Sequence, residues 1–468
     1  MATNWYPEII QGGMGVNISN WFLARLVSTL GQLGTVSGVA LERILVAILQ
    51  RGDQGGHVRR ALNHFPFQDV VKEVLDNYFV EGGATNGRYK NAPMFTINPS
   101  RQLIALVVCA NFAFVWLAKE RHNNPVSINY LEKIQMPHIY AITGAMLAGV
   151  DYLTMGAGIA LQVPEVIKNV LEGQEVRYRI HVEGEKIKEH TMCFNPKDFF
   201  GHRLPEMRKP MFLPIIASNL LAKLFTSKLP DGSVYGFVVE EPTAGGHNAP
   251  PRTPVIGDDG RRILVYGSKD EVDYDAITKI GLPFWIGGGS KRLSWAKQKG
   301  AKGIQAGSIF ALCNQSGMEP GLRQQARRLG FQGELQIRTD MRISPTGFPF
   351  KVACIPGTLA DKNVMEERPL VCNQGALVTP FEKPDGSIGY RCPSEATAPF
   401  LVKGGRLEET EGRGCVCNGL LSTCGMNSDP NEPAVVTLGD NCDFLRLLMK
   451  DENDFYNVAD AIKYLLSQ

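Results

Sequence analysis

Residues 283–308 read PFWIGGGSKRLSWAKQKGAKGIQAGS, and this stretch holds two apolar runs that each end in small residues. The first run ends in three glycines and the second in Gln-Ala-Gly-Ser, while Ser290–Lys299 between them has helical periodicity. A strand, a glycine turn and a helix form the repeating unit of parallel α/β folds. Two such turns in close succession favour a sheet that closes on itself.

The same unit recurs through the chain, where segments of helical periodicity separate most of eight short apolar runs. The expected strands are Ile9–Val16, Gly34–Gly38, Leu103–Asn111, Tyr152–Gly158, Met211–Ser218, Tyr235–Gly246, Pro283–Gly289 and Gly303–Ser308. The expected helices include Asn20–Thr29, Pro164–Leu171, Asn219–Leu224, Val272–Ile280 and Ser290–Lys299. Parallel strands buried on both faces form continuous apolar runs. The pattern therefore predicts an α/β fold, a (β/α)8 TIM barrel, with an open doubly wound sheet as the alternative.

The barrel is expected to occupy residues 1–340, with three insertions that are too long for ordinary loops. The first, at about 39–102, predicts helices, and the third, at about 249–262, predicts a surface loop. The second, at about 172–208, predicts a β-hairpin with strands at Val176–Val182 and Lys186–Phe194. Residues 341–468 are expected to form a separate carboxyl-terminal region rich in Cys, Pro and Gly, with a final helix at Asp454–Leu466.

The composition is that of an ordinary globular protein of 468 residues, with 44% hydrophobic residues, 21% charged residues and a net charge of +2. No basic stripe interleaved with aromatics is present, so we expect no nucleic acid partner. The amino terminus lacks the pattern of a secretion signal, and Leu103–Ala118 is shorter than the roughly 20 residues of a bilayer span. We expect a cytoplasmic protein without a membrane span; the sequence leaves a homo-oligomer open.

Ten cysteines are a modest number for this length, and six of them follow residue 371. Cys415-Val416-Cys417 raises zinc or an iron–sulfur cluster as an alternative, with Cys372, Cys392, Cys424 and Cys442 as further ligands. No Cys-x-x-Cys pair occurs, and the spacings match no common cluster motif. We therefore expect reduced, free thiols and no metal ligands.

The glycine turns after the seventh and eighth expected strands indicate a phosphate site, because these two loops commonly bind phosphate in barrels. A flexible tight turn is the simpler alternative for either loop alone. After the first strand, Gln11-Gly12-Gly13-Met14-Gly15 brings backbone close to a ligand, and Met14 can pack on a ring. No nucleotide-triphosphate loop and no Gly-x-Gly-x-x-Gly motif is present. A planar cofactor with a phosphate tail, such as flavin mononucleotide (FMN), fits these features.

His247 follows two glycines in the stretch Glu240–Arg252, directly after an apolar run. Because the pKa of an ordinary histidine is about 6.5, a neutral imidazole at a strand end can take a proton at physiological pH. A structural histidine is the alternative. Glu240 and Glu241 raise the idea of an acid pair, but we expect them to be solvated or salt-bridged.

Five motifs in this order resemble those of the nitronate monooxygenase family, formerly called 2-nitropropane dioxygenases. They are Gln11-Gly12-Gly13-Met14-Gly15, Gly34-Thr35-Val36-Ser37-Gly38, Ala244-Gly245-Gly246-His247, Gly287-Gly288-Gly289 and Gln305-Ala306-Gly307-Ser308, and they span about 300 residues. The resemblance implies an FMN-binding barrel in which His247 lies against the flavin and acts as the base. It implies a cofactor site at Gly13, Met14, Asn111, Gly267, Gly288, Gly289, Gln305, Ala306, Gly307 and Ser308.

The resemblance implies an FMN-dependent oxidoreductase that oxidises alkyl nitronates or similar carbon acids with O2. The same family includes FMN-dependent enoyl-thioester reductases, so reduction by NAD(P)H is the alternative, and a flavin-holding partner subunit is a weaker one. Ser344–Lys351 resembles a segment of longer relatives, some attached to polyunsaturated fatty-acid synthesis. Asn248-Ala249-Pro250-Pro251-Arg252 departs from the family pattern after His247, and we expect this stretch to shape the substrate pocket.

Overall fold

Eight parallel strands form one sheet in the order β1-β13-β12-β8-β7-β4-β3-β2 in the computed structural model, which describes residues 5–84, 90–184, 189–253, 255–256, 262–288 and 292–468. The strands are β1 (Ile9–Gln11), β2 (Gly34–Ser37), β3 (Val126–Leu131), β4 (Tyr152–Gly156), β7 (Met211–Ile216), β8 (Phe237–Glu240), β12 (Phe284–Gly287) and β13 (Gly303–Ala306).

The sheet closes between its first and last strands. The Gln11 amide donates to the Leu33 carbonyl at 3.0 Å, the Leu33 amide donates to the Ile9 carbonyl at 3.1 Å, and Ile10 forms a parallel bridge with Leu33. The predicted (β/α)8 barrel is confirmed, and the open sheet is excluded.

Side chains from every second residue of the strands fill the barrel interior. Ile10, Leu33, Tyr152, Leu213, Val238 and Trp285 form one buried cluster, and their neighbours along each strand belong to the larger core shared with the helices. Successive strand residues point to opposite faces of a sheet, so this cluster is the barrel interior. The Trp285 indole donates to the Pro7 carbonyl at 2.7 Å and holds the amino-terminal segment across the interior.

The third expected strand, Leu103–Asn111, is wrong: these residues lie in helix α5 (Arg101–Lys119), which the Ser100 side chain caps. The third strand is β3, which pairs with β2 and β4. A helix buried on nearly every side is as apolar as a buried strand, so the pattern did not distinguish them. Among the described residues α5 is the one helix long and apolar enough to cross a membrane, but 78% of that window is buried, as in a core helix of a globular protein.

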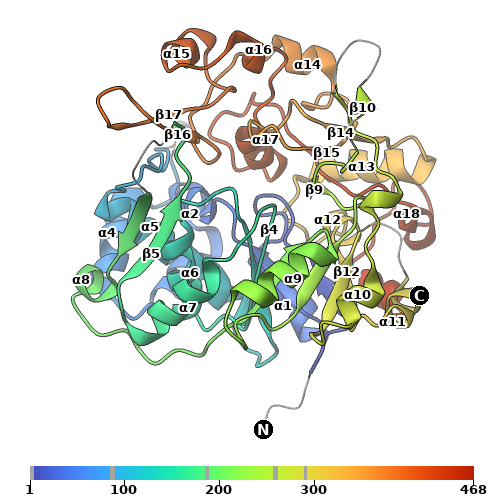
Figure 1. The fold of residues 1–468 in the computed structure, drawn as a ribbon, viewed down its shortest axis with the longest axis horizontal. Coiled ribbons are helices and arrows are strands. Elements are labelled where there is room, and N and C mark those ends of the chain that lie inside the picture. Colours follow the sequence, from blue (N-terminus) through green and yellow to red (C-terminus); the bar gives the residue numbers. More distant parts are fainter. Residues whose placement is uncertain (1–4, 85–89, 185–188, 254, 257–261, 289–291) are drawn as a thin grey trace.

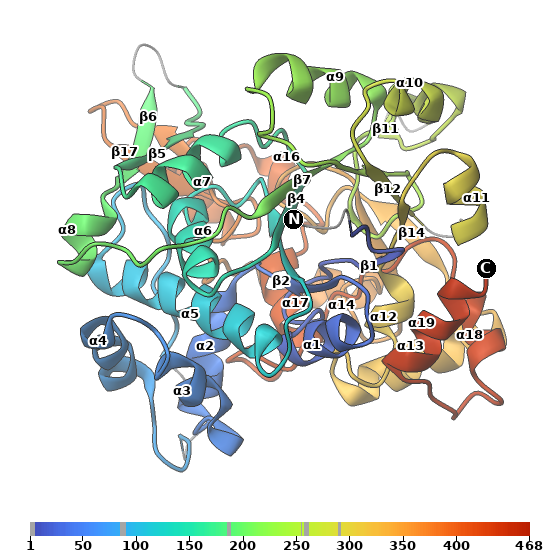
Figure 2. The same cartoon turned by 90° about the horizontal axis from the view of Figure 1, so that it is seen from below.

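Helices surround the barrel (Figure 2). The five helices expected from the sequence are present, and the Asn20 side chain caps the first of them. These helices are α1 (Trp21–Thr29), α7 (Val163–Glu172), α9 (Asn219–Lys228), α10 (Tyr274–Thr278) and α11 (Leu293–Gln298). The barrel also carries α6 (His138–Leu147), α12 (Ser308–Ala311), α13 (Pro320–Gln332) and α19 (Val458–Leu466).

Extra elements follow β2, α7 and β9. Between β2 and α5 lie α2 (Leu41–Gln50), η1 (Gln54–Gly56), α3 (His57–Leu62) and α4 (Gln68–Tyr78). β5 (Val176–Ile180) pairs antiparallel with β6 (His190–Phe194), and α8 (Pro196–Phe200) follows them. After β9 (Gly246–His247), the short strands β10 (Val255–Ile256) and β11 (Arg262–Ile263) pair where a loop was expected, followed by η2 (Ser268–Asp270).

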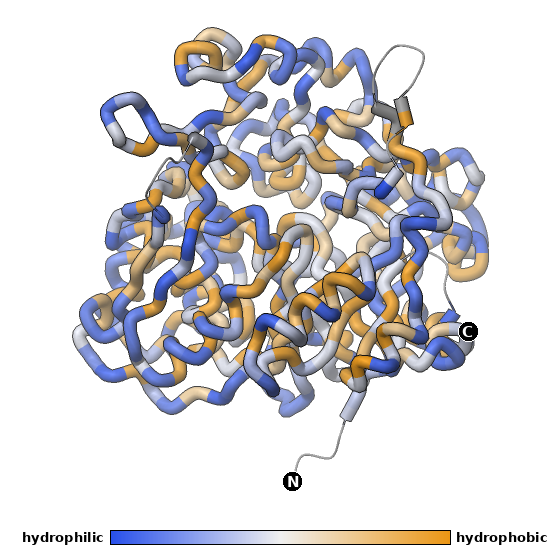
Figure 3. The backbone as a smooth tube through the Cα atoms, viewed as in Figure 1, coloured by the Kyte–Doolittle hydropathy of each residue, from blue (hydrophilic) through white to orange (hydrophobic). Residues whose placement is uncertain are grey.

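The carboxyl-terminal residues lie above the carboxyl ends of the barrel strands (Figure 1). They contain β14 (Ile337–Asp340), β15 (Phe350–Ala353), β16 (Thr379–Glu382), β17 (Ile388–Arg391), α14 (Lys362–Glu367), α15 (Thr397–Val402), α16 (Leu407–Thr410), α17 (Val416–Thr423) and α18 (Phe444–Leu448). β15 joins β14 to β9, and residues such as Ile355, Leu421 and Leu438 belong to the main core. Figure 3 shows apolar stretches of the backbone both in the barrel and in this layer.

Candidate active site

A cavity of about 490 Å³ lies at the carboxyl ends of the barrel strands, between the barrel and the carboxyl-terminal layer. The carboxyl-terminal face is where barrel enzymes place their active sites. Its lining contains many glycines: Gly12, Gly13, Gly15, Gly156, Gly245, Gly246, Gly287, Gly288, Gly307 and Gly439. A ligand in this cavity therefore meets bare backbone over much of its surface.

The turn after β1 is held rigidly by its own polar side chains. The Gln11 side chain accepts from the Thr35 amide at 2.9 Å and donates to the Gly12 carbonyl at 2.7 Å. A Cβ atom at Gly13 would lie 2.3 Å from the Cβ of Asn129, so only glycine fits between β1 and β3. Gly13 and Met14, which the resemblance assigns to the cofactor site, both line the cavity.

The loops after β12 and β13 form the opposite wall. Gly288, Gln305, Ala306, Gly307 and Ser308 all line the cavity. Gly288 has a φ of +131°, and a Cβ there would lie 2.8 Å from the Thr243 hydroxyl. Gly289 lies outside the described residues. Arg292 also lines the cavity and brings a positive charge to this wall.

His247 lies in β9, and its imidazole lines the same cavity. β9 pairs antiparallel with β15, which places His247 opposite Phe350, and the two rings meet edge to face at 4.8 Å. The His247 Nε2 lies 2.7 Å from the Oγ of the fully buried Ser344, which in turn lies 2.8 Å from the Thr346 hydroxyl.

Burial lowers the pKa of His247 to about 3, and the nearby Lys133 ammonium acts in the same direction. The imidazole is therefore neutral at physiological pH. Lys133 donates to the Ala157 carbonyl at 2.7 Å and lies 3.4 Å above the Phe348 ring, and its burial lowers its own pKa to about 8. The sequence did not single out Lys133, because its partners come from distant segments.

Asn111 does not belong to the cavity lining. On α5 it donates to the Val107 carbonyl at 2.9 Å and accepts from the Tyr130 hydroxyl at 2.9 Å, so its role is to join α5 to β3. The asparagine that lines the cavity from the third strand is Asn129. The alternation in Val-Ser-Ile-Asn-Tyr-Leu, residues 126–131, was the signal that identifies this strand.

Gly267 also lies away from the cavity lining. It precedes η2, where its amide donates to the Asp270 carboxylate at 2.9 Å. A Cβ at Gly267 would meet no atom of the described residues within 4 Å, so none of them requires glycine at this position. The placement of Gly267 in the cofactor site is therefore not supported by the geometry.

Glu240 is a residue of the cavity that sequence reasoning assigned to a solvated loop. It ends β8 and lines the cavity, and its burial raises its pKa to about 8. Glu241 instead accepts a hydrogen bond from the Tyr274 hydroxyl at 2.7 Å. The two carboxyls therefore do not act as one acid pair, and the salt-bridged alternative does not describe Glu240.

The segment Thr437–Asp440 crosses between the histidine turn and the loop after β13, and we call it the strap. The Gly246 amide donates to the Thr437 hydroxyl at 2.7 Å, and the Gly439 amide donates to the Ser308 hydroxyl at 2.8 Å. The Asp440 amide donates to the Thr243 carbonyl at 3.0 Å. The strap fixes the two loops relative to each other.

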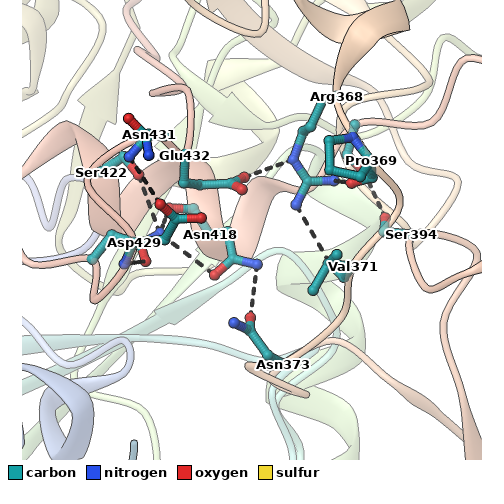
Figure 4. Close-up of polar contacts among 12 residues, drawn as sticks. Arg368, Pro369, Val371, Asn373, Ser394, Asn418, Ser422, Asp429, Asn431 and Glu432 are labelled. Carbon is teal, nitrogen blue, oxygen red and sulfur yellow. Dashed lines mark hydrogen bonds and ion pairs between the residues drawn. The ribbon is translucent and has the colours of Figure 1, made fainter. Parts of the chain in front are cut away.

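A polar network joins the segments that flank Cys372 and Cys417 (Figure 4). Arg368 forms an ion pair with Glu432 at 2.7 Å, and the Asn418 amide donates to Asn373 at 2.9 Å. Cys417 lines the cavity, and all ten cysteines are free thiols. Among the described residues, no three His, Cys, Asp or Glu side chains group so that they could hold a metal ion.

No family model and no curated protein matches this sequence. Among solved structures, the chain resembles a mutant of FabK from Thermotoga maritima, over 99% of this chain and 92% of that one, with 11% identity and a TM-score of 0.49.

The chain also resembles a nitroalkane oxidase from Streptomyces ansochromogenes, covering 98% of this chain and 95% of that one, with 12% identity and a TM-score of 0.43. A third neighbour is the enoyl reductase domain of MlnA from the macrolactin biosynthesis cluster of Bacillus amyloliquefaciens, covering 98% and 94%, with 9% identity and a TM-score of 0.45.

Proposed function

We propose that this protein is an FMN-dependent oxidoreductase that oxidises alkyl nitronates or similar carbon acids with O2, with His247 as the base. The observation that carries the proposal is a neutral imidazole in a glycine-lined cavity at the carboxyl ends of the barrel strands. A neutral imidazole accepts a proton, whereas an imidazolium does not.

The lining fits a flavin with a phosphate tail. Gly307 leaves room for a flat ring close to the backbone, Met14 is the side chain next to that space, and Gly13 lines the same cavity. Gly288, Ser308 and Arg292 would face the phosphate with backbone, a hydroxyl and a positive charge. When bound, FMN would supply a two-electron acceptor for the carbon acid.

The protein's own groups would prepare the proton transfer. Ser344 and Phe350 hold the imidazole from two sides, so its orientation is set before a substrate enters. A proton leaves the acidic carbon of a nitroalkane for His247, and the anion stays in the cavity. A nitronate arrives already without that proton, so it does not need the base.

A substitution of His247 by Ala tests this proposal. The variant should keep its bound flavin, because His247 stands among many other lining groups, while turnover of neutral nitroalkane should fall by about 100-fold or more. Turnover of the preformed nitronate should change far less. Equal losses on both substrates would contradict the base assignment.

Reduction of an enoyl thioester by NAD(P)H is the second candidate, because Ser344, which contacts His247, lies in the segment that resembles reductase-associated relatives. Mixing the protein with NADH or NADPH in the absence of oxygen distinguishes the reductase from the oxidase. Rapid bleaching of the flavin would overturn a pure oxidase; slow bleaching together with nitronate turnover in air would overturn the reductase. A protein that binds flavin but is inactive in both assays would instead be a flavin-holding partner subunit.

A further inference from the structure

Glu240 lies between two cavities. Besides the main cavity, it lines a smaller one of about 110 Å³ together with Asn248, Arg252 and Tyr266. This smaller space, which we call the side cavity, is lined by the stretch after His247 that departs from the family pattern. The residues that depart from the family pattern therefore lie on the side of Glu240 opposite the main cavity.

The strand register explains why Glu240 faces inward. Val238 belongs to the cluster inside the barrel, and residues two apart on a strand point to the same face. Glu240, the last residue of β8, therefore points toward the barrel axis at the mouth of the main cavity. It pairs with Gly287 on β12, whose missing side chain leaves the space beside it open.

Among the described residues, no charged partner compensates the Glu240 carboxyl. Across the described residues it forms no hydrogen bond or ion pair, and burial is the one cause of its raised pKa. The charged and titratable groups around it are occupied elsewhere. Glu241 binds Tyr274, Arg252 donates to the Lys269 carbonyl, Tyr266 donates to the Ala249 carbonyl, Asp270 accepts from the Arg252 amide, and His247 binds Ser344.

The side cavity also contains a buried acceptor. Asn248 is 4% exposed, and its Oδ1 has no hydrogen-bond partner among the described residues, although its amide nitrogen donates to the Ala244 carbonyl at 3.1 Å. The side cavity itself is large enough for several water molecules. Water there would connect Glu240 with the outside.

We propose that Glu240 is a second catalytic residue, a carboxylic acid that donates its proton to an anion in the main cavity and regains one from solvent through the side cavity. In this step the carboxyl O–H bond breaks, and the proton goes to the oxygen anion that two-electron reduction of O2 produces. The nitronate is not the acceptor, because its protonation would reverse the step on His247. A proton from solvent then reaches the Glu240 carboxylate through water in the side cavity. At pH 7 burial leaves the Glu240 carboxyl protonated, with a proton to give, and the His247 imidazole neutral, with a nitrogen that can accept one. The inference rests on the proposed oxidoreductase function.

The test compares Glu240→Gln with Glu271→Gln, which removes an exposed carboxylate outside both cavities. The acid must be protonated to act, so wild-type kcat should fall as the pH rises through about 8. Glu240→Gln should lower kcat by about 100-fold and abolish this fall. Glu271→Gln should change neither property, and Glu240→Asp should retain part of the activity and the high-pH fall.

Infrared difference spectra of the purified protein between pH 6 and pH 9.5 provide a readout that needs no turnover. A protonated carboxyl should disappear near pH 8 in the wild type and be absent in Glu240→Gln. The proposal is overturned if this signal is missing, or if Glu240→Gln keeps the wild-type kcat and pH profile. Absence of flavin or of turnover in the wild type itself would instead reject the proposed function.

Discussion

The His247 imidazole is neutral because its ring is buried, and the glycines beside it in the sequence do not cause this. The Gly-Gly-His motif identified the residue, but its environment comes from Ser344 and Phe350, about a hundred residues later in the chain. A sequence shows no contact between such distant residues. Glu240 was misjudged for the same reason, since only the barrel register shows that it points inward.

The depressed pKa of His247 predicts a pH-dependent stability. Its value of about 3 in the folded protein lies below the ordinary 6.5, so the folded state resists protonation that the unfolded chain accepts. The free energy of unfolding should be highest above pH 6.5 and fall as the pH drops toward 3. In His247→Gln this fall between pH 7 and pH 4 should be smaller by about 3 kcal/mol.

Urea unfolding at several pH values measures this difference. His138 is a matched control, because burial lowers its pKa to about 4 and it lies away from the main cavity. His138→Gln should reduce the acid dependence in the same way without changing turnover. An acid dependence unchanged in His247→Gln would contradict the assigned protonation state.

At the scale of elements, seven of the eight barrel strands were predictable because each is a short apolar run that ends in small residues. The third was not, because α5 is more apolar than β3 and hid it from a search for continuous apolar runs. Because of this error, Asn111 was assigned to the position in the cavity that Asn129 occupies in the structure.

The turn after β1 gives a test at this scale. Gly13→Ala should drive a methyl group into the Asn129 side chain, separate β1 from β3 and lower both flavin retention and stability, the latter by about 2 kcal/mol. Gly267→Ala is the control, since its φ is −135° and its Cβ would meet nothing within 4 Å. Flavin absorbance and thermal unfolding report both effects. A loss of flavin in Gly267→Ala would restore that glycine to the cofactor site.

At the scale of the whole molecule, residues 341–468 share a core with the barrel. Leu438, Phe444 and Tyr456 are buried with barrel residues in one cluster, and the Tyr456 hydroxyl donates to the Ile309 carbonyl at 2.6 Å. The sequence indicated a composition change near residue 340 but not these contacts, because composition does not show which surfaces meet.

We therefore predict one cooperative unfolding transition for the full chain. Calorimetry should give a single peak, with equal calorimetric and van't Hoff enthalpies, because neither part keeps a complete core without the other. Circular dichroism and tryptophan fluorescence should follow the same curve. Two resolved transitions would show that residues 341–468 fold as an independent unit.

The strap has a consequence for how the protein is made. Every barrel strand leaves the ribosome before Thr437–Asp440 is synthesised, yet this segment joins the loops that carry His247 and Ser308. In a nascent chain that contains all eight strands but not the strap, the loops that carry His247 and Ser308 are therefore not yet joined, and the cavity lining is incomplete. Loading of a ligand into the finished cavity therefore follows synthesis of the strap, and the strap determines when the protein becomes competent.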